Sequence, residues 1–291
     1  MKKIIKTCFV VGVLCVVVYV ASGTDIFKNG LSRFAKPFFE LEEIHYFNES
    51  VEISKDEECV EDTYFYTKVQ KLNIKSAGVE VTFTECEGEE FFVEANMIHE
   101  YQTFLKEGEL FIVAREQNVR ELGKGKVTIS IPTAVYDDGL LELDIESSAS
   151  KIVFDRVVAR GMELDVSAGT VSWQELTTGE LSIEMAAGTV NGTNTTVTGT
   201  SDIKVNAGSI TLAGILGTET GIETAAGKVE LALTDAYNDY NYALSCAGGS
   251  VKIGEQAVEG IAKTLEIEHG AIKHMDIECS VGAVNICFTE E

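Results

Sequence analysis

The sequence predicts an all-β protein: a single-stranded β-solenoid, built as a stack of glycine-cornered rungs, preceded by one N-terminal transmembrane helix. Three observations lead to this prediction. A turn that ends in glycine, usually Ala-Gly, recurs at intervals of 19, 20, 19, 22 and 33 residues. Mostly apolar residues stand five and three positions before each glycine and two after it, with polar residues between them, which is the alternation of strands that stack in periods. A basic and then apolar segment opens the chain. The corner glycines are Gly169, Gly188, Gly208, Gly227, Gly249 and Gly282.

Residues 1–23 form the predicted anchor. Three lysines, Lys2, Lys3 and Lys6, precede the uninterrupted apolar run of Cys8–Ala21. Together with Ile4, Ile5 and Thr7 this run reaches about membrane-spanning length. Basic residues before the run and acidic residues after it favour an N-terminus inside and the bulk of the chain outside. A cleaved signal peptide is the alternative, because the apolar core is short and the small residues of 21–23 suit a peptidase. We therefore expect a single-pass protein whose residues 24–291 are extracellular, or a secreted one if cleavage occurs.

Residues 24–68 read as a juxtamembrane and acidic linker. Asp25–Phe39 is basic and aromatic, so it could lie at the membrane surface or pack as a short helix on its neighbour. Glu40–Asp62 is acidic and weakly patterned. A segment with so few alternating apolar residues is expected to be mobile in part.

Residues 69–139 form the predicted N-terminal β-strand region. Apolar alternation runs into an early corner at Gly78 and leaves it again. Residues 91–95 and 110–114 are further strands, the second preceded by the hairpin-type turn of Lys106–Glu109. A strand from Val127 ends at Pro132, which cannot donate to a ladder.

Residues 140–291 form the predicted solenoid domain. Ser148-Ala149-Ser150 is a degenerate corner 19 residues before Gly169. Trp173 and Gly192 occupy a column that is otherwise Leu or Ile, so we expect these rungs to pack differently. An excess of about 13 residues lies between the last two corners, and within it we expect a loop and a short helix over Gly254–Lys263.

Stacking in chain order predicts which side chains become neighbours. Glu184, Lys204 and Glu223 form one ladder of alternating sign, and Glu230 lies beside Lys252. If the extra residues loop out, Cys246 and Cys279 become neighbours in one inward column. We expect stacked reduced thiols there, because parallel in-register side chains often have the wrong dihedral angle for a disulfide.

Charge and cysteine usage exclude several classes of function. The chain of 291 residues carries a net charge of −24, with +5 in residues 1–36, −15 in 37–160 and −14 in 161–291. So acidic a body disfavours nucleic acid as a partner. Seven cysteines without a C-x-x-C pair indicate neither a disulfide scaffold nor a zinc site.

Residues with catalytic or metal-binding chemistry do not gather into a recognisable motif. Four histidines, His45, His99, His269 and His274, stand apart from any nucleophile signature, and surface positions are expected for them. Acidic pairs such as Asp137-Asp138 are expected by chance in this composition, and no calcium-loop pattern accompanies them. We therefore predict no enzyme, no cofactor and no metal site, with bound calcium on the acidic surface left open. The corner glycines are predicted to be structural residues, because the chain must turn sharply between rungs and glycine takes a positive φ without cost.

The hydrophobic N-terminus, the I-x-I-P ending of the strand at 127–132 and turns of the Ala-Ala-Gly-Lys-Val-Glu-Leu kind carry a resemblance. Over roughly residues 70–288 the chain resembles a bacterial β-strand-repeat family of unknown molecular function, whose members carry the label "putative adhesin". The resemblance implies the fold and supplies no active-site residues. Some similar proteins accompany cell-envelope stress systems, which implies a regulatory or interaction role as well.

The sequence thus predicts a non-catalytic, membrane-anchored surface module of a bacterial cell envelope that adheres to or binds a protein or cell-wall partner. One alternative is a partner-binding component of an envelope-stress or signalling system. The other is a solenoid enzyme that acts on polysaccharide, which would present a cluster of carboxylates in a groove.

Overall fold

The computed structural model describes residues 60–116, 120–138, 141–259 and 263–290. All of them belong to one compact unit that spans Glu49–Glu291. No helix among these residues is long and apolar enough to cross a membrane. The predicted anchor of residues 1–23 and most of the predicted linker lie outside the described residues.

The described chain is all-β, as the alternation predicts, with one short helix and one 3-10 turn. The first half contains β1 (Val60–Tyr66), β2 (Lys71–Ala77), β3 (Glu80–Cys86), β4 (Phe91–Ile98), β5 (Glu100–Lys106), β6 (Glu109–Arg115), β7 (Lys126–Pro132), α4 (Thr133–Asp138), β8 (Glu142–Met185) and β9 (Thr189–Val205). The second half contains β10 (Ser209–Leu216), β11 (Glu219–Thr224), β12 (Lys228–Ala236), η1 (Tyr237–Asp239), β13 (Tyr240–Cys246), β14 (Ser250–Ile253), β15 (Gln256–Glu259), β16 (Lys263–Ile267), β17 (Lys273–Cys279) and β18 (Ala283–Glu290).

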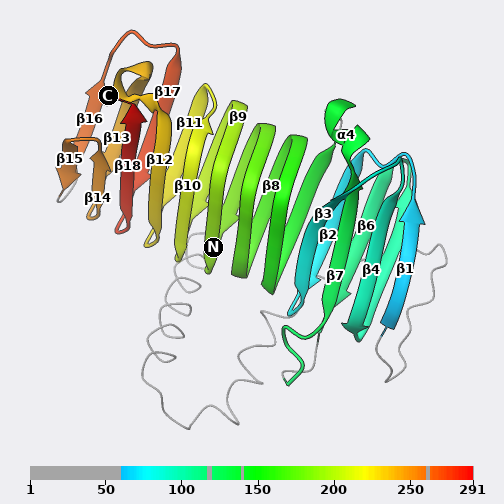
Figure 1. Ribbon diagram of the computed structural model, residues 1–291. Coiled ribbons are helices and arrows are strands. Elements are labelled where there is room, and N and C mark those ends of the chain that lie inside the picture. The colour runs from blue at the N-terminus through cyan, green and yellow to red at the C-terminus, as the bar shows by residue number, and fades with distance from the viewer. Residues whose placement is uncertain (1–59, 117–119, 139–140, 260–262, 291) are drawn as a thin grey trace, which may run out of the picture. The chain divides into compact units, whose positions relative to one another are not determined.

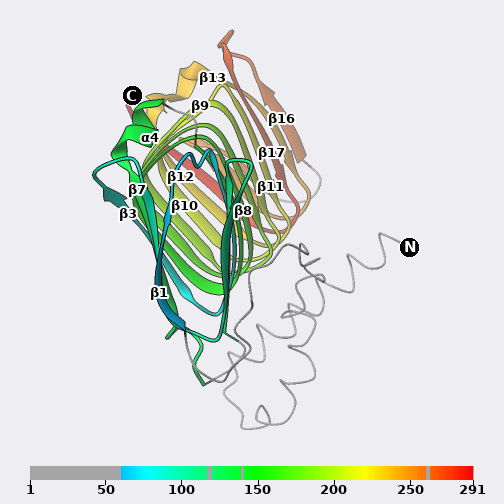
Figure 2. The ribbon, with the colours of Figure 1, turned by 90° about the vertical axis from the view of Figure 1, so that its right-hand side faces the viewer.

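One hydrogen-bonded sheet of 18 strands is folded into two layers that enclose the core (Figure 1; Figure 2). We call layer A the series β5, β6, β2, β8, β9, β11, β17, β13, β16, in spatial order. Layer B is the series β1, β4, β7, β3, β8, β9, β10, β12, β18, β14, β15. The long strands β8 and β9 run through both layers, so a glycine corner joins the two halves of each repeat.

Successive repeats in the middle of the stack pair in parallel and in register. Ile183 pairs with Ile203, and Ile203 with Ile222, and all three side chains are buried. The ladder predicted on the outer surface is present in the same pairing, with Lys204 between Glu184 and Glu223. Burial of equivalent apolar columns from both layers forms one continuous core.

The last repeat departs from chain order. Strand β17 lies between β11 and β13, and β18 lies between β12 and β14, so the C-terminal residues enter the stack one place before the repeat that precedes them in sequence. The expectation that Glu230 lies beside Lys252 is therefore wrong: Asn285 pairs with both and separates them. Columns of equivalent apolar residues allow either order, because both rungs present the same inward pattern.

The N-terminal end shows the same exchange. Strands β2 and β3 precede β6 and β7 in the chain, yet they lie between β8 and these two strands, which form the outer parallel rung. The early corner at Gly78 thus stacks on the degenerate corner at Ser148, through a hydrogen bond from the Gly78 amide to the Ser148 carbonyl. At the N-terminal end the earlier rung lies inside the rung that follows it in sequence. At the C-terminal end the last rung lies inside the rung that precedes it.

Antiparallel strands cover both ends of the parallel stack. Strand β5 pairs with β6 and β4 with β7 at one end, while β16 pairs with β13 and β15 with β14 at the other. The helix expected over Gly254–Lys263 is wrong at residues 256–259, which form β15. Pairing to the exposed edge of β14 satisfies backbone groups that a helix would leave open to another chain.

The irregular column at Trp173 is confirmed and explained. Trp173 pairs with Gly192 in the next repeat, and the indole lies so close that a β-carbon on Gly192 would collide with the ring. The indole nitrogen donates to the Thr195 hydroxyl at 2.9 Å. The tryptophan therefore fills space that Leu and Ile side chains share in later repeats.

Candidate functional site

The six predicted corner glycines all lie at the joins between the layers, where backbone amides and carbonyls of neighbouring repeats meet. The Ser209 amide donates to the Gly188 carbonyl at 3.0 Å, and the Lys228 amide to the Gly208 carbonyl at 2.9 Å. These contacts are between backbones of adjacent rungs, so they support the structural role that the sequence suggests.

Two different constraints require glycine at these corners. Gly169, Gly188 and Gly208 have φ of 115°, 117° and 112°, which L-residues rarely adopt. Gly227, Gly249 and Gly282 are not among the positive-φ residues, which corrects the single explanation drawn from sequence. A β-carbon on any of these three would instead collide with a residue of the adjoining rung: the Val205 side chain above Gly227, the Gly282 carbonyl above Gly249 and the Gly227 carbonyl above Gly282.

The outer surface of layer A is strongly acidic. Burial, followed by repulsion from Glu163, Glu184, Glu146 and Asp144, raises the pKa of Asp165 to about 6. The equivalent surface of layer B carries small polar side chains in register, such as Thr170, Thr189 and Ser209. The two layers therefore present different chemistry, and the charge of the repeats is concentrated on one of them.

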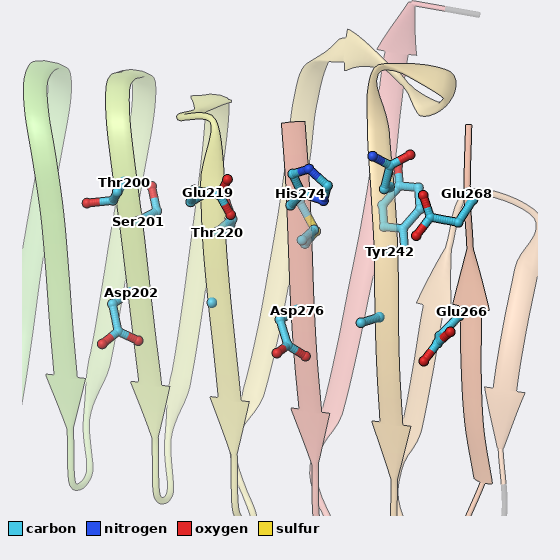
Figure 3. A pocket seen from close by; sticks show the side chains of 14 residues that line it. Thr200, Ser201, Asp202, Glu219, Thr220, Tyr242, Glu266, Glu268, His274 and Asp276 are labelled. Carbon is cyan, nitrogen blue, oxygen red and sulfur yellow. The ribbon is translucent and has the colours of Figure 1, made fainter. Parts of the chain in front are cut away.

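An open hollow of about 570 Å³ lies on the outer surface of layer A, over β9, β11, β17, β13 and β16. Figure 3 shows two rows of side chains across these strands. One row contains Thr200, Glu219, His274 and Glu268, and the other contains Asp202, Asp276 and Glu266.

Small residues separate the carboxylates of the second row. Gly221 pairs with Asp202 on one side and with Asp276 on the other. Ala243 in turn stands between Asp276 and Glu266. Carboxylate-bearing strands are therefore two strand spacings apart, roughly 9.6 Å, with an open place between them.

Hollow 1, the hollow just described, lacks cations of its own. Five carboxylates line it, from Asp202, Glu219, Glu266, Glu268 and Asp276, and no lysine or arginine does. Asp202 accepts a hydrogen bond from Lys204 at 2.6 Å. Among the residues that the structure describes, the other four form no ion pair.

A second hollow of about 560 Å³, hollow 2, lies further along layer A and differs in this respect. Its lining includes Lys71 and Arg160. Lys71 pairs with Asp144 at 3.3 Å, and Arg160 pairs with Glu142. Three of the five carboxylates that line hollow 2, those of Glu142, Asp144 and Asp202, therefore have a cationic partner in the chain, whereas in hollow 1 only Asp202, which lines both hollows, has one.

The predicted cysteine neighbours are brought together. Cys246 and Cys279 pair in register between β13 and β17, are buried, and are both free. Burial, followed by the neighbouring Cys246, raises the pKa of the Cys279 thiol. Their reduced state in solution stays a prediction: mass measurement of the alkylated, unreduced, denatured chain should find both labelled, and a protected pair would contradict it.

The histidines do not gather. His99 lies 2.6 Å from the buried carboxylate of Glu116, the ring of His269 contacts the Tyr240 carbonyl at 2.7 Å, and His274 lines hollow 1. His45 lies outside the described residues. No group of three or more potential metal ligands occurs within the described ranges.

Sequence reasoning missed hollow 1. Asp202 and Asp276 stand at equivalent positions of their repeats, so aligning the repeats could have shown two carboxylates on the same outward row. The place of Asp276 next to Gly221 could not be found that way, because the C-terminal rung is inserted out of chain order.

The solved structures that match this chain include two that are titled as putative cell-adhesion proteins. One, titled a putative adhesin from Bacteroides fragilis NCTC 9343, has 14% sequence identity and a TM-score of 0.48, and the match covers 80% of this chain and 98% of that one. The other, titled a putative cell adhesion protein from Clostridium sporogenes ATCC 15579, has 12% identity and a TM-score of 0.31, over 80% of this chain and 100% of that one. No curated protein matches the chain.

A family model also matches the chain. The model of the family Toastrack DUF4097 matches residues 69–254, which is more than half of the chain and includes five of the six corner glycines, from Gly169 to Gly249. The protein belongs to the Toastrack DUF4097 family.

Proposed function

We propose that this protein is a non-catalytic surface module of a bacterial cell envelope, a β-solenoid held at the outer face of the membrane by residues 4–21. The observation that supports it best is the outer surface of layer A, which exposes unneutralised carboxylates over several strands. A broad, charged and open surface suits a protein or cell-wall partner better than a small substrate that must be enclosed. The parallel, in-register repeats support the solenoid description.

The anchored topology rests on the lysines before the apolar run and the acidic residues after it. Protease added to intact, wall-stripped cells should digest residues 24–291 and leave a cytoplasmic control protein whole. Full protection of the chain would overturn the proposed location. The mass of the mature chain distinguishes an uncleaved anchor from a secreted form.

A role in an envelope-stress or signalling system is compatible with the same surface, because the partner would then be another membrane protein. Cross-linking in intact cells followed by identification of the attached chain separates the two roles. Attachment to a sensor protein favours signalling, whereas attachment to wall material favours adhesion.

The carboxylates of hollow 1 are also the feature expected of a polysaccharide-acting solenoid enzyme. Asp202 and Asp276 lie on the same face with Gly221 of β11 between them, on strands roughly 9.6 Å apart. Asp276 is exposed, whereas a general acid is usually held in an apolar site. We therefore place catalysis second, and release of reducing ends from envelope polysaccharide would favour it.

A further inference from the structure

We infer that hollow 1 binds an extended, lysine- or arginine-rich segment of a partner protein that crosses β9, β11, β17, β13 and β16. This inference rests on the proposed role of the protein as a binding module, and it names the chemistry of the partner. Its basis is the combination of an open hollow, five carboxylates and the absence of lysine and arginine from the described lining.

Charge complementarity selects the sign of the partner. Hollow 2 has a similar size and also five acidic residues in its lining, but Lys71 and Arg160 of the same chain already pair with two of them. In hollow 1, Glu219, Asp276 and Glu266 point to solvent from three different strands. Mutual repulsion of these groups is relieved when cations from outside lie between them.

The spacing of the carboxylates selects an elongated partner over a single metal ion. Asp202 and Asp276 flank Gly221 at two strand spacings, roughly 9.6 Å, and no group of three or more potential metal ligands occurs among the described residues, whereas calcium takes about six to eight oxygen ligands. A segment in the extended polyproline II conformation advances about 3.1 Å per residue, or about 9.3 Å in three residues, which complete one turn. A cation at every third residue of such a segment therefore matches the alternation of acidic and small side chains.

Gly221 and Ala243 provide the places where the cationic side chains lie. A β-carbon on Gly221 would have only the Asp202 Oδ1 atom near it, at 3.5 Å, so the place is open and a side chain fits without backbone strain. Elsewhere on layer A the chain already pairs a lysine with a carboxylate of the neighbouring strand: Lys75 of β2 lies 2.6 Å from Glu146 of β8. Lys204, one row away from the carboxylates of hollow 1, pairs with Asp202 of its own strand.

The test is a binding measurement with the full-length chain in neutral detergent at low salt. The probe is a nonapeptide that repeats Lys-Ser-Gly, and the comparison peptide has the same composition with its lysines adjacent. We expect the spaced peptide to bind several-fold more tightly, and binding to weaken as salt rises. Equal affinity for the two peptides would overturn the match in spacing.

Variants locate the site. Asp276→Asn with Glu266→Gln should weaken binding about tenfold or more, which corresponds to the loss of about 1.4 kcal/mol. Glu163→Gln with Glu184→Gln removes the same charge from layer A outside hollow 1, and it should change affinity less than threefold. An equal loss in both pairs would show attraction to net charge alone and would overturn the assignment to hollow 1.

A third variant adds the cation to the chain. Gly221→Lys should abolish peptide binding while the melting temperature stays that of the parent, because the new ammonium occupies the place between Asp202 and Asp276. Unchanged binding would contradict the inference.

Binding of an oligomeric glucosamine in preference to the peptide would overturn the choice of a protein partner. If the protease test finds the chain outside the cell but the spaced peptide does not bind, only this inference is overturned. If the protease test finds residues 24–291 inside the cell, the proposed function is overturned.

Discussion

Single residues in this protein are constrained by the close approach of neighbouring rungs. Gly208 has a φ of 112°, and a β-carbon there would stand 2.5 Å from the Gly188 carbonyl oxygen. Gly161 by contrast has no atom within 4 Å of the place a β-carbon would take, and its φ is not positive. Substitutions at the two positions therefore distinguish the strain specific to a corner from the general effect of replacing a glycine.

We predict that Gly208→Val lowers the free energy of unfolding by about 1–3 kcal/mol or more, from strained φ and collision with the adjoining backbone. Gly161→Ala should be neutral or slightly stabilising. Chemical denaturation of the full-length chain measures both. A Gly208→Val protein that unfolds with the parent would show that the corner is not constrained.

Asp165 gives a second prediction at this scale. Its pKa rises from 3.8 to about 6 in the folded chain, first through burial and then through repulsion by neighbouring carboxylates. A raised folded pKa favours folding below the unfolded pKa, and this contribution is lost as pH rises through about 6. Asp165→Asn should therefore raise the melting temperature at pH 7 and have little effect near pH 4. Glu223→Gln, beside Lys204, is the control, and a larger gain there would contradict this account.

At the scale of elements, the stack encloses its first and last rungs. Strands β17 and β18 have parallel neighbours on both sides, so their backbone groups pair twice, and the strands that would expose an edge are covered by β15 and β16. The same holds at the other end, where β2 and β3 lie inside β6 and β7. At both ends of this quasi-one-dimensional stack the last parallel strands are thereby covered by antiparallel strands.

This order predicts which engineered thiols can be joined. In a chain that lacks the exposed Cys287, Glu230→Cys with Asn285→Cys should react rapidly with a short bifunctional thiol reagent, because their strands are adjacent. Glu230→Cys with Lys252→Cys should react slowly, because β18 separates them. Faster reaction of the second pair would mean that the rungs stack in chain order.

At the scale of the whole described unit, charge is divided between the two layers. Layer A carries the acidic rows and both hollows, whereas layer B carries hydroxyl side chains such as Thr170, Thr189 and Ser209 at equivalent positions. Carboxylates within a Debye length, about 10 Å at 0.1 M salt, repel one another and oppose the folded state. This division leaves one layer suited to cationic partners.

We therefore predict that the melting temperature of the full-length chain rises as sodium chloride is raised from low to physiological concentration. Each kcal/mol of relieved repulsion corresponds to a rise of about 2–4 °C for a unit of this size. The variant Glu163→Gln with Glu184→Gln should respond less to salt than the parent. A melting temperature that falls with added salt would show that favourable ion pairs outweigh repulsion on layer A.

The sequence by itself determined the local structure of this protein. Alternation with a period of two assigned inward and outward faces, and the glycine spacing placed the corners, so the ladder at Lys204 and the pairing of Cys246 with Cys279 were both predicted. These features depend on residues within one rung or on rungs of equal length.

The tertiary structure alone decided the order of the rungs at both ends. All rungs present similar apolar columns. Cys279 therefore fits between Thr224 and Cys246, which would be direct neighbours if the rungs stacked in chain order. The observed order, with β16 on the edge of β13 and β15 on the edge of β14, sets Asp276 beside Gly221 in hollow 1.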